Sequence, residues 1–357
     1  MAAISREKLP LYLNERHGDR QPSSLQWTVM LISGVLIYGS HSVLLNLCKV
    51  DGKIPFNSAS VVLMIELTKL LFSLTMRRLE LGIRVGSGRL GLPKVKYWVP
   101  FSVPALLYCI NNNIVVHIQL YMDPASFQVL SNLKIAATAV LYRMVMQRPL
   151  NLQTCSLPEA LDVVPPCSNR RLSWIQWSAL ALLTIAGISN SYGGLMNAGT
   201  VDEYDTSSKV HVTMWGLVLV LTYCAISGTS GVYTEFILKR QPQLSLHVQN
   251  ILLYIFGAVL NLFVFLGSSW SSTDGTADFF AGYTVITWVI ILTQAGNGLI
   301  ISAVMKHASN ITRLFIISCA MLVTTVASMV LFSLELNLYF CFSFVLVIVA
   351  MVLYHRK

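Results

Sequence analysis

The stretch Leu246–Gly267 reads LHVQNILLYIFGAVLNLFVFLG and contains no Lys, Arg, Asp or Glu. A helix that crosses a membrane needs about 20 predominantly apolar residues, so this stretch is long and apolar enough to span a bilayer. The whole chain shares its character, because 55% of the 357 residues are hydrophobic and only 11% are charged. A soluble domain carries about 25% charged residues. We therefore expect lipid rather than water to surround most of the protein.

Hydropathy predicts ten membrane-spanning helices separated by polar connections. The predicted spans are 27–47, 58–76, 98–119, 124–146, 172–192, 212–238, 246–267, 282–304, 311–333 and 337–354. The predicted fold class is therefore an all-α polytopic membrane protein. The first 26 residues contain Pro10 and Pro22 and lack the apolar core of a signal peptide, so they indicate a short tail.

The positive charges are distributed unevenly between alternating connections. Of the 25 Lys and Arg residues, 19 lie in the tails and the connections of one side, and only Lys49, Lys53 and Lys209 lie on the other. Lys and Arg accumulate on the cytosolic side of membrane proteins, so both termini are predicted to be cytosolic. The net charge of +9 then reflects loops close to anionic lipid, and we expect no nucleic-acid binding.

The two halves of the chain show a weak internal repeat. Similar features recur at offsets of 184–186 residues, in the pairs Tyr38 and Tyr223, Glu66 and Asn250, Asn111 and Asn297, and Phe127 and Arg313. Five spans per half is an odd number, so the second half runs upside down relative to the first, as in many secondary transporters. The predicted organisation is a cytosolic tail (1–26), a first five-helix half (27–192), a lumenal loop (193–211), and a second half with a short cytosolic tail (212–357).

Polar side chains inside the predicted spans are the candidates for a binding site, because a charged group at mid-bilayer costs at least about 2.5–3.5 kcal/mol. Glu66 and Lys69 are three residues apart and share one helix face, where they either neutralise each other or serve a ligand. Lys134 lies about ten residues into its span, so we expect it to meet Glu66, Glu235 or an anionic substrate. The candidate substrate-binding residues are Glu66, Lys69, Tyr108, Asn112, Asn113, Gln128, Lys134, Tyr233, Asn250, Tyr254, Gly298 and Lys306.

This set of residues suits a phosphorylated ligand that carries a base. Lysine is a point-charge partner for phosphate, while amides and aromatic rings suit the edge and the face of a nucleobase. The chain has no HExxH, GxSxG or phosphate-loop motif, so we expect no enzyme activity. The seven cysteines show no CxxC or His-rich spacing, and no metal or other cofactor is expected. A membrane-embedded enzyme and a non-transporting receptor or scaffold are the alternatives.

At these residues the chain resembles the nucleotide-sugar transporters of solute carrier family 35, subfamily A. Six segments in order carry the resemblance: Glu66–Lys69 (ELTK), Tyr108–Asn113 (YCINNN), Phe127–Ile135 (FQVLSNLKI), Ser227–Glu235 (SGTSGVYTE), Val248–Tyr254 (VQNILLY) and Lys306–Ile311 (KHASNI). The chain departs from the family at Phe127, where members often have Tyr, and at Ala136, where they often have Pro.

The resemblance implies a drug/metabolite transporter-like fold and a Golgi antiporter. Such a protein exchanges a cytosolic pyrimidine nucleotide-sugar for a lumenal nucleoside monophosphate, and both UDP-sugars and CDP-linked alditols such as CDP-ribitol remain candidates. Carried over by position, Lys134, Lys69 and Lys306 would meet phosphate. The nucleotide pocket would be lined by Asn112, Asn113, Tyr233, Asn250 and Tyr254. The sequence leaves the oligomeric state open.

Overall fold

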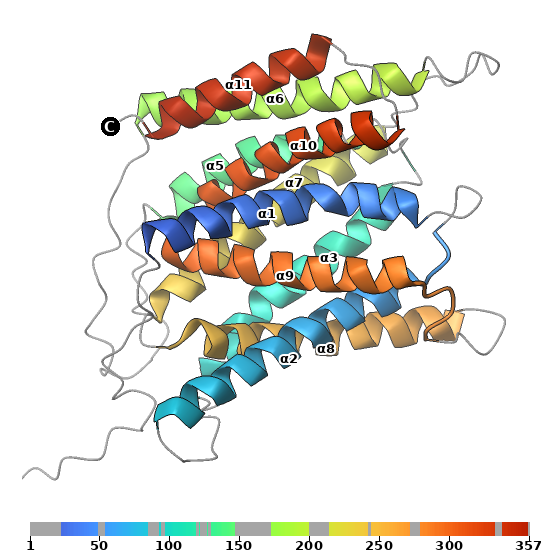
Figure 1. Cartoon of the computed structure of the whole chain (residues 1–357), viewed down its shortest axis with the longest axis vertical. Coiled ribbons are helices and arrows are strands. Elements are labelled where there is room, and N and C mark those ends of the chain that lie inside the picture. Colours follow the sequence, from blue (N-terminus) through green and yellow to red (C-terminus); the bar gives the residue numbers. More distant parts are fainter. Residues whose placement is uncertain are drawn as a thin grey trace, which may run out of the picture. The chain divides into compact units, whose positions relative to one another are not determined.

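A computed structural model describes residues 23–48, 54–84, 93, 97–118, 121, 127, 130–146, 173–199, 214–241, 244–271, 279–332 and 338–355. These residues form α-helices and no β-strand (Figure 1). The helices are α1 (Ser24–Leu47), α2 (Ser58–Arg84), α3 (Val99–Ile118), α5 (Leu133–Met146), α6 (Trp174–Gly199), α7 (Met214–Arg240), α8 (Leu246–Ser271), α9 (Val285–His307), α10 (Asn310–Phe332) and α11 (Leu338–His355). The predicted all-α class is confirmed for this part of the chain.

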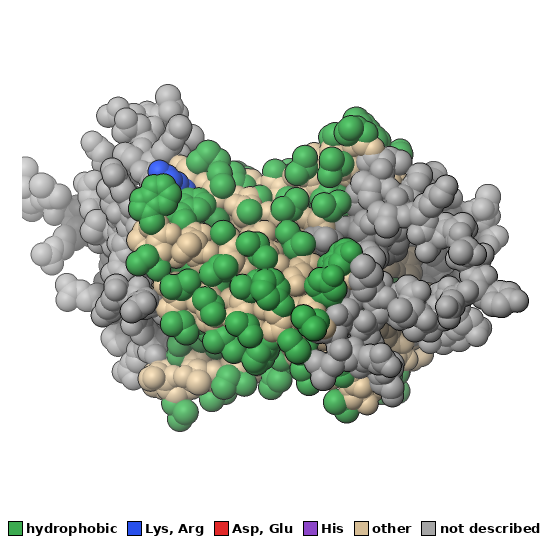
Figure 2. Space-filling view, turned by 90° about the horizontal axis from the view of Figure 1, so that it is seen from above, with side chains coloured by type: hydrophobic (Ala, Val, Ile, Leu, Met, Phe, Trp, Pro, Cys, Tyr) green, Lys and Arg blue, Asp and Glu red, His purple; other side chains and the backbone are tan. Residues whose placement is uncertain are grey.

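Many of these helices are suited to a bilayer. In the described part of the chain, six segments are long and apolar enough to cross a membrane: Ser24–Leu47, Ser58–Leu81, Met214–Arg240, Leu246–Gly267, Val285–His307 and Asn310–Leu331. Large apolar side chains also point outward, among them Val285, Leu292 and Phe263, and Figure 2 shows a face crowded with hydrophobic side chains. Because contiguous apolar surface of this extent is not tolerated in water, the chain is a multi-pass membrane protein.

Helix ends differ from the hydropathy boundaries where the helix continues into polar sequence. Span 58–76 was predicted to end before Arg77, yet α2 continues to Arg84. The Arg77 guanidinium lies 3.1 Å from the Glu80 carboxylate one turn later, which supports the helix beyond the apolar stretch. Hydropathy detects where the apolar residues end, whereas helical hydrogen bonding ends later. In the same way α6 runs to Gly199, past the predicted end at residue 192.

The chain folds into two compact units, and both combine segments that are distant in sequence. Unit 1 comprises residues 1–109 and 237–309, and unit 2 comprises residues 110–236 and 310–357. Each predicted half of the sequence, 27–192 and 212–357, therefore contributes helices to both units. The division into two inverted repeats remains a prediction.

In unit 1, α2 packs against α8 and α9, and α1 packs against α9. One apolar cluster consists of Cys48, Phe56, Val61, Ile290 and Ile291. The chain enters α9 through a tight turn, in which Gly282 has a φ of 72° and a Cβ would overlap the carbonyl oxygen of Pro55. Only glycine meets both demands without strain.

The start of α9 is held by a reciprocal cap. The Thr284 hydroxyl accepts a hydrogen bond from the Thr287 backbone N–H at 3.3 Å, and the Thr287 hydroxyl accepts one from the Thr284 N–H at 3.1 Å. Two of the N–H groups that lack a partner inside the helix are thereby satisfied. The cap fixes where α9 begins, and hence the register of the residues that α9 presents to α2 and α8.

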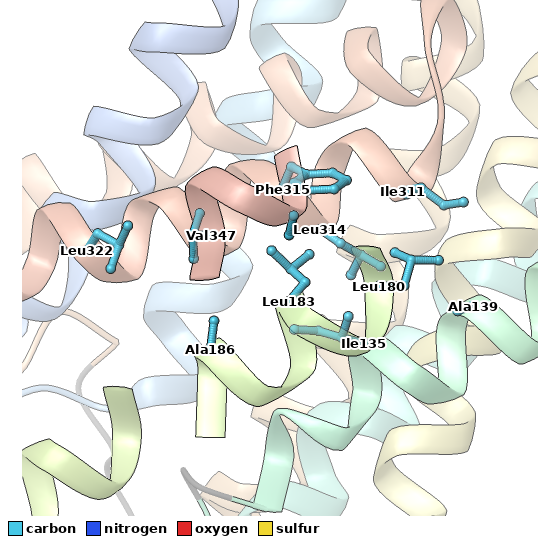
Figure 3. Close-up of a cluster of buried hydrophobic side chains, with 11 residues drawn as sticks. Ile135, Ala139, Leu180, Leu183, Ala186, Ile311, Leu314, Phe315, Leu322 and Val347 are labelled. Atoms are coloured by element: carbon cyan, nitrogen blue, oxygen red, sulfur yellow. The ribbon is translucent and has the colours of Figure 1, made fainter. Parts of the chain in front are cut away.

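In unit 2, α6 packs against α11, α5 and α10. Their buried apolar side chains, which include Ile135, Leu183, Leu314 and Val347, meet in the cluster drawn in Figure 3. Helix α7 approaches α5 closely at Gly228, where a Cβ would lie 3.2 Å from the backbone of Thr138. A small residue is needed at such a crossing, as is usual between helices in membranes.

Candidate functional site

Unit 1 holds an ion pair inside a membrane-spanning helix. The Lys69 ammonium lies 2.5 Å from Oε1 of Glu66, one helical turn earlier on α2, and the two side chains are only 11% and 17% exposed. The sequence spacing predicted this shared face, and the pairing itself is now observed. Because both groups are largely removed from water, neither would be stable at this depth without the other.

An aromatic ring on α8 forms one wall of the space around the lysine. The Lys69 ammonium lies 4.5 Å from the centre of the Tyr254 ring, a distance at which a cation is attracted to the ring face. The Tyr254 side chain is buried, and its hydroxyl donates to the carbonyl oxygen of Gly298 on α9 at 3.5 Å. Tyr254 therefore links the helix that carries the ion pair to α9.

Two glycines leave room for the charged side chains. A Cβ at Gly298 would lie 2.8 Å from Cδ of Lys69, and a Cβ at Gly257 would lie 2.8 Å from Oε2 of Glu66. Such contacts are closer than van der Waals packing allows. The backbones of α8 and α9 thus reach the ion pair directly. We call the set Glu66, Lys69, Tyr254, Gly257 and Gly298 the lysine slot.

One turn before Tyr254 on α8 lies a second buried polar contact. The Ser302 hydroxyl on α9 donates a hydrogen bond to Oδ1 of Asn250, and both side chains are buried. Asn250 and Tyr254 are four residues apart and so share a face of α8, and both turn toward α9. Ser302 was not predicted, although it lies on the same face of α9 as Gly298, four residues later, and that spacing was a usable signal.

One other candidate in unit 1, Lys306, lies apart from this contact set. Lys306 follows Gly298 by two turns on α9, roughly 12 Å along the helix, and its ammonium donates to the Leu244 carbonyl oxygen at 2.8 Å. It thereby secures the segment that precedes α8. Tyr108 is half-buried on α3.

In unit 2, Lys134 is half-buried in the first turn of α5. Asn132, two residues before Lys134, holds this end of the helix in place. Its side-chain amide donates to the Gly187 carbonyl oxygen at 3.1 Å and to the Ser191 hydroxyl at 2.9 Å, both on α6. A Cβ at Gly187 would lie 2.7 Å from Oδ1 of Asn132. Asn132, which the sequence did not place in the site, thus anchors the start of the helix that carries Lys134.

Glu235 on α7 is fully buried and serves a helix end. Its carboxylate accepts a hydrogen bond at 2.7 Å from the backbone N–H of Asn310, the first residue of α10, and one at 3.5 Å from the Tyr142 hydroxyl. A carboxylate at a helix N-terminus satisfies a free N–H and interacts favourably with the helix dipole. Tyr233, two residues earlier, is half-buried with its ring 6.2 Å from that of Phe236.

The asparagine triplet on α3 is split between environments. Asn111 is buried and Asn112 is exposed, because three consecutive residues of a helix cannot all face one side. Gln128 and the side chain of Asn113 lie outside the described residues. Among the described residues, no group of three His, Cys, Asp or Glu side chains could hold a metal ion.

The lysine slot offers a cation, a carboxylate and an aromatic face in a site poor in water. Such a set can bind and release an anion, since the Lys69 ammonium attracts a phosphate while the Glu66 carboxylate competes with it for the ammonium. None of the described contacts arranges a nucleophile beside a base.

Comparison with known proteins identifies the family. The sequence profile described as "Nucleotide-sugar transporter" matches residues 24–157 and 166–355. "Probable UDP-sugar transporter protein SLC35A4" of Xenopus tropicalis is 43% identical over 345 residues, which cover 96% of both chains. The proteins of the same name are 42% identical in Danio rerio, over 94% of this chain and 98% of that one, and 41% identical in Homo sapiens, over 95% and 96%. These names denote transporters, which fits the prediction that the chain is not an enzyme.

A protein of known crystal structure shares the fold. It has a TM-score of 0.60 and 10% sequence identity, and the match covers 92% of this chain and 96% of that chain. At this identity the likeness concerns the fold alone. The match of the family profile over nearly the whole sequence, together with relatives above 40% identity, shows that the chain belongs to the nucleotide-sugar transporter family.

Proposed function

We propose that the chain is an antiporter of the Golgi membrane. It exchanges a cytosolic pyrimidine nucleotide-linked sugar or alditol, of the UDP-sugar or CDP-ribitol type, for a lumenal nucleoside monophosphate. The names of the relatives, probable UDP-sugar transporters, support a UDP-linked substrate. Exchange proceeds by alternating access, in which the substrate site opens to one side of the membrane at a time.

The lysine slot is the observation that carries this proposal. Lys69 is a cation that is 11% exposed within a membrane helix, and it is oriented by the Tyr254 ring 4.5 Å away. Ionisable residues inside the membrane mark substrate pathways by default. An ammonium held at a defined position with three donor hydrogens suits the oxygen atoms of a phosphate.

The remaining predicted residues are assigned by family position. We propose that Lys134, with Lys306 as a further cation, contacts phosphate. By the same resemblance, the nucleotide pocket would be lined by Asn112, Asn113, Tyr233, Asn250 and Tyr254. The firm anchoring of α5 at Asn132 supports the role of Lys134, because a residue that recognises charge benefits from a helix that does not move.

We also propose ten membrane spans, arranged as two inverted repeats, with both termini in the cytosol. The unequal distribution of Lys and Arg supports this orientation. A glycosylation sequon inserted into the predicted lumenal loop 193–211 should be modified in cells. The same sequon in the predicted cytosolic loop 147–171 should not be modified, and the reverse result would invert the topology.

The substrate class is tested by a thermal-shift panel on the purified protein. CMP, CDP, UMP, UDP, GDP and AMP are compared at equal concentration, since a ligand that binds the native state raises the melting temperature. We expect stabilisation by the pyrimidine nucleotides only. Equal shifts with GDP and AMP would refute the assignment of a pyrimidine.

Exchange itself is tested in liposomes that contain the protein and are preloaded with UMP or CMP. Labelled nucleotide-sugar should enter only preloaded vesicles and should be recovered chemically unchanged. A hydrolysed product would indicate an enzyme. Nucleotide binding with no uptake would indicate a receptor.

A further inference from the structure

The lysine that is proposed to bind phosphate already has an anion beside it. Oε1 of Glu66 lies 2.5 Å from the Lys69 ammonium, so the pair carries no net charge. The contact is within one helical turn of α2 and does not depend on another helix. An incoming phosphate therefore meets a cation that is already neutralised.

A phosphate and Glu66 cannot both remain close to Lys69 without cost. Two anions on one cation leave a net negative charge, and charge repulsion is strong where the side chains are 11% and 17% exposed. The carboxylate is also packed closely against α8, since a Cβ at Gly257 would lie 2.8 Å from its second oxygen. Substrate binding thus requires that Glu66 yields its place on the ammonium.

We propose that Glu66 is a resident counter-ion that competes with the substrate phosphate for Lys69 and so promotes substrate release. This inference rests on the proposed function. In the empty transporter Glu66 neutralises Lys69. In the loaded transporter the phosphate takes its place, and the return of Glu66 expels the phosphate. Fast exchange requires that the substrate is not bound too tightly, and competition from Glu66 limits the affinity for the substrate phosphate.

The test compares two glutamates of the same helix. Glu66→Gln keeps the size of the side chain and removes its charge. Glu80→Gln makes the same change in a second i,i+3 pair of α2, where Glu80 lies 3.1 Å from Arg77. In Glu66→Gln, the phosphate no longer has to break the charge-assisted hydrogen bond between Glu66 and Lys69. This variant should therefore bind UMP roughly tenfold or more tightly than the wild type. Glu80→Gln should bind UMP like the wild type.

In exchange assays, Glu66→Gln should lower both the KM and the maximal rate, because release becomes slower. Unchanged or weaker UMP binding would overturn the inference, since a carboxylate that merely holds the lysine in place would cause a loss when it is removed. Glu66→Asp, with a carboxylate that is one methylene group shorter, should tighten binding by a smaller factor. It provides the same test should Glu66→Gln fail to fold.

The tighter UMP binding of Glu66→Gln must also depend on Lys69. In a Lys69→Gln background, Glu66→Gln should give no further tightening, and an equal gain there would contradict competition for Lys69. The inference and the proposed function fail in different ways. If the wild-type protein neither binds nor exchanges pyrimidine nucleotides, the proposed function is wrong. If it does both, while Glu66→Gln does not bind more tightly, only the role of Glu66 is wrong.

Discussion

The substitution Gly298→Ala would place a methyl group inside the lysine slot. Its Cβ would lie 2.8 Å from Cδ of Lys69, and 3.6 and 3.7 Å from Nζ and Cε. Carbon atoms in contact lie about 3.5–4.0 Å apart, so the middle of the lysine side chain must move by roughly 1 Å. The ammonium cannot follow freely, because Glu66 and the Tyr254 ring hold it. Overpacking of this kind costs about 1–3 kcal/mol.

This cost should appear mainly in nucleotide affinity, because the atoms displaced are those proposed to bind phosphate. A loss of about 1–3 kcal/mol corresponds to a Kd for UMP raised by roughly 5- to 150-fold. Titration calorimetry on purified protein measures this change directly. Thermal unfolding of the ligand-free protein reports whether the fold is intact.

Gly296→Ala is the matched control, two residues earlier on the same helix. A Cβ there would meet nothing within 4 Å. Alanine stabilises a helix by about 1 kcal/mol relative to glycine, so Gly296→Ala should bind UMP like the wild type and melt no lower. Wild-type affinity in Gly298→Ala would refute the lysine slot as a nucleotide contact. An equal loss in both variants would mean that the glycines of α9 act through the helix and not through Lys69.

Three further predictions concern the other features described above. Lys134→Ala should leave the protein folded but lower nucleotide exchange in liposomes by at least about tenfold, because a charge-assisted contact is lost. Arg143→Ala on the same helix is the control and should keep most of the activity. Wild-type exchange by Lys134→Ala would reject the proposed role of Lys134. Asn132→Leu removes two buried hydrogen bonds to α6 and should lower the stability by about 1–3 kcal/mol, as measured by thermal unfolding; an unchanged melting temperature would show that α5 is anchored by its apolar contacts. Gly282→Ala should reduce the yield of folded protein more than Lys134→Ala or Asn132→Leu does, since it combines a left-handed φ with overlap of a backbone oxygen. A normal yield would mean that the turn before α9 can rearrange.

Much of the fold could be predicted because a bilayer imposes a simple rule on sequence. The apolar stretch 246–267 lies within α8, Leu246–Ser271, and the charges of Glu66 and Lys69 were expected to share a face because three residues make almost one turn. These are local relations. They require only the helical period and the thickness of the membrane.

The contacts between distant segments could not be predicted in this way. Lys69 and Tyr254 are separated by 185 positions, and no periodicity within α2 or α8 indicates which residue of one meets which residue of the other. Gln249 illustrates the same limit. It lies next to Asn250, but its amide donates to the Leu238 and Gln241 carbonyl oxygens at 3.0 and 2.8 Å and so completes the end of α7. Adjacent amides of the same chemical type thus have different tasks, which only packing decides.

The position of the Glu66–Lys69 pair within a single turn also matters while the protein is being made. Helix α2 emerges from the ribosome long before α8 and α9, the helices against which it finally packs. A lone lysine or glutamate would then enter the lipid with no neighbour to shield it. Because each residue brings the opposite charge on the same helix, the apolar part of α2, residues 58–76, can enter the membrane as an electrically neutral segment before α8 and α9 pack against it.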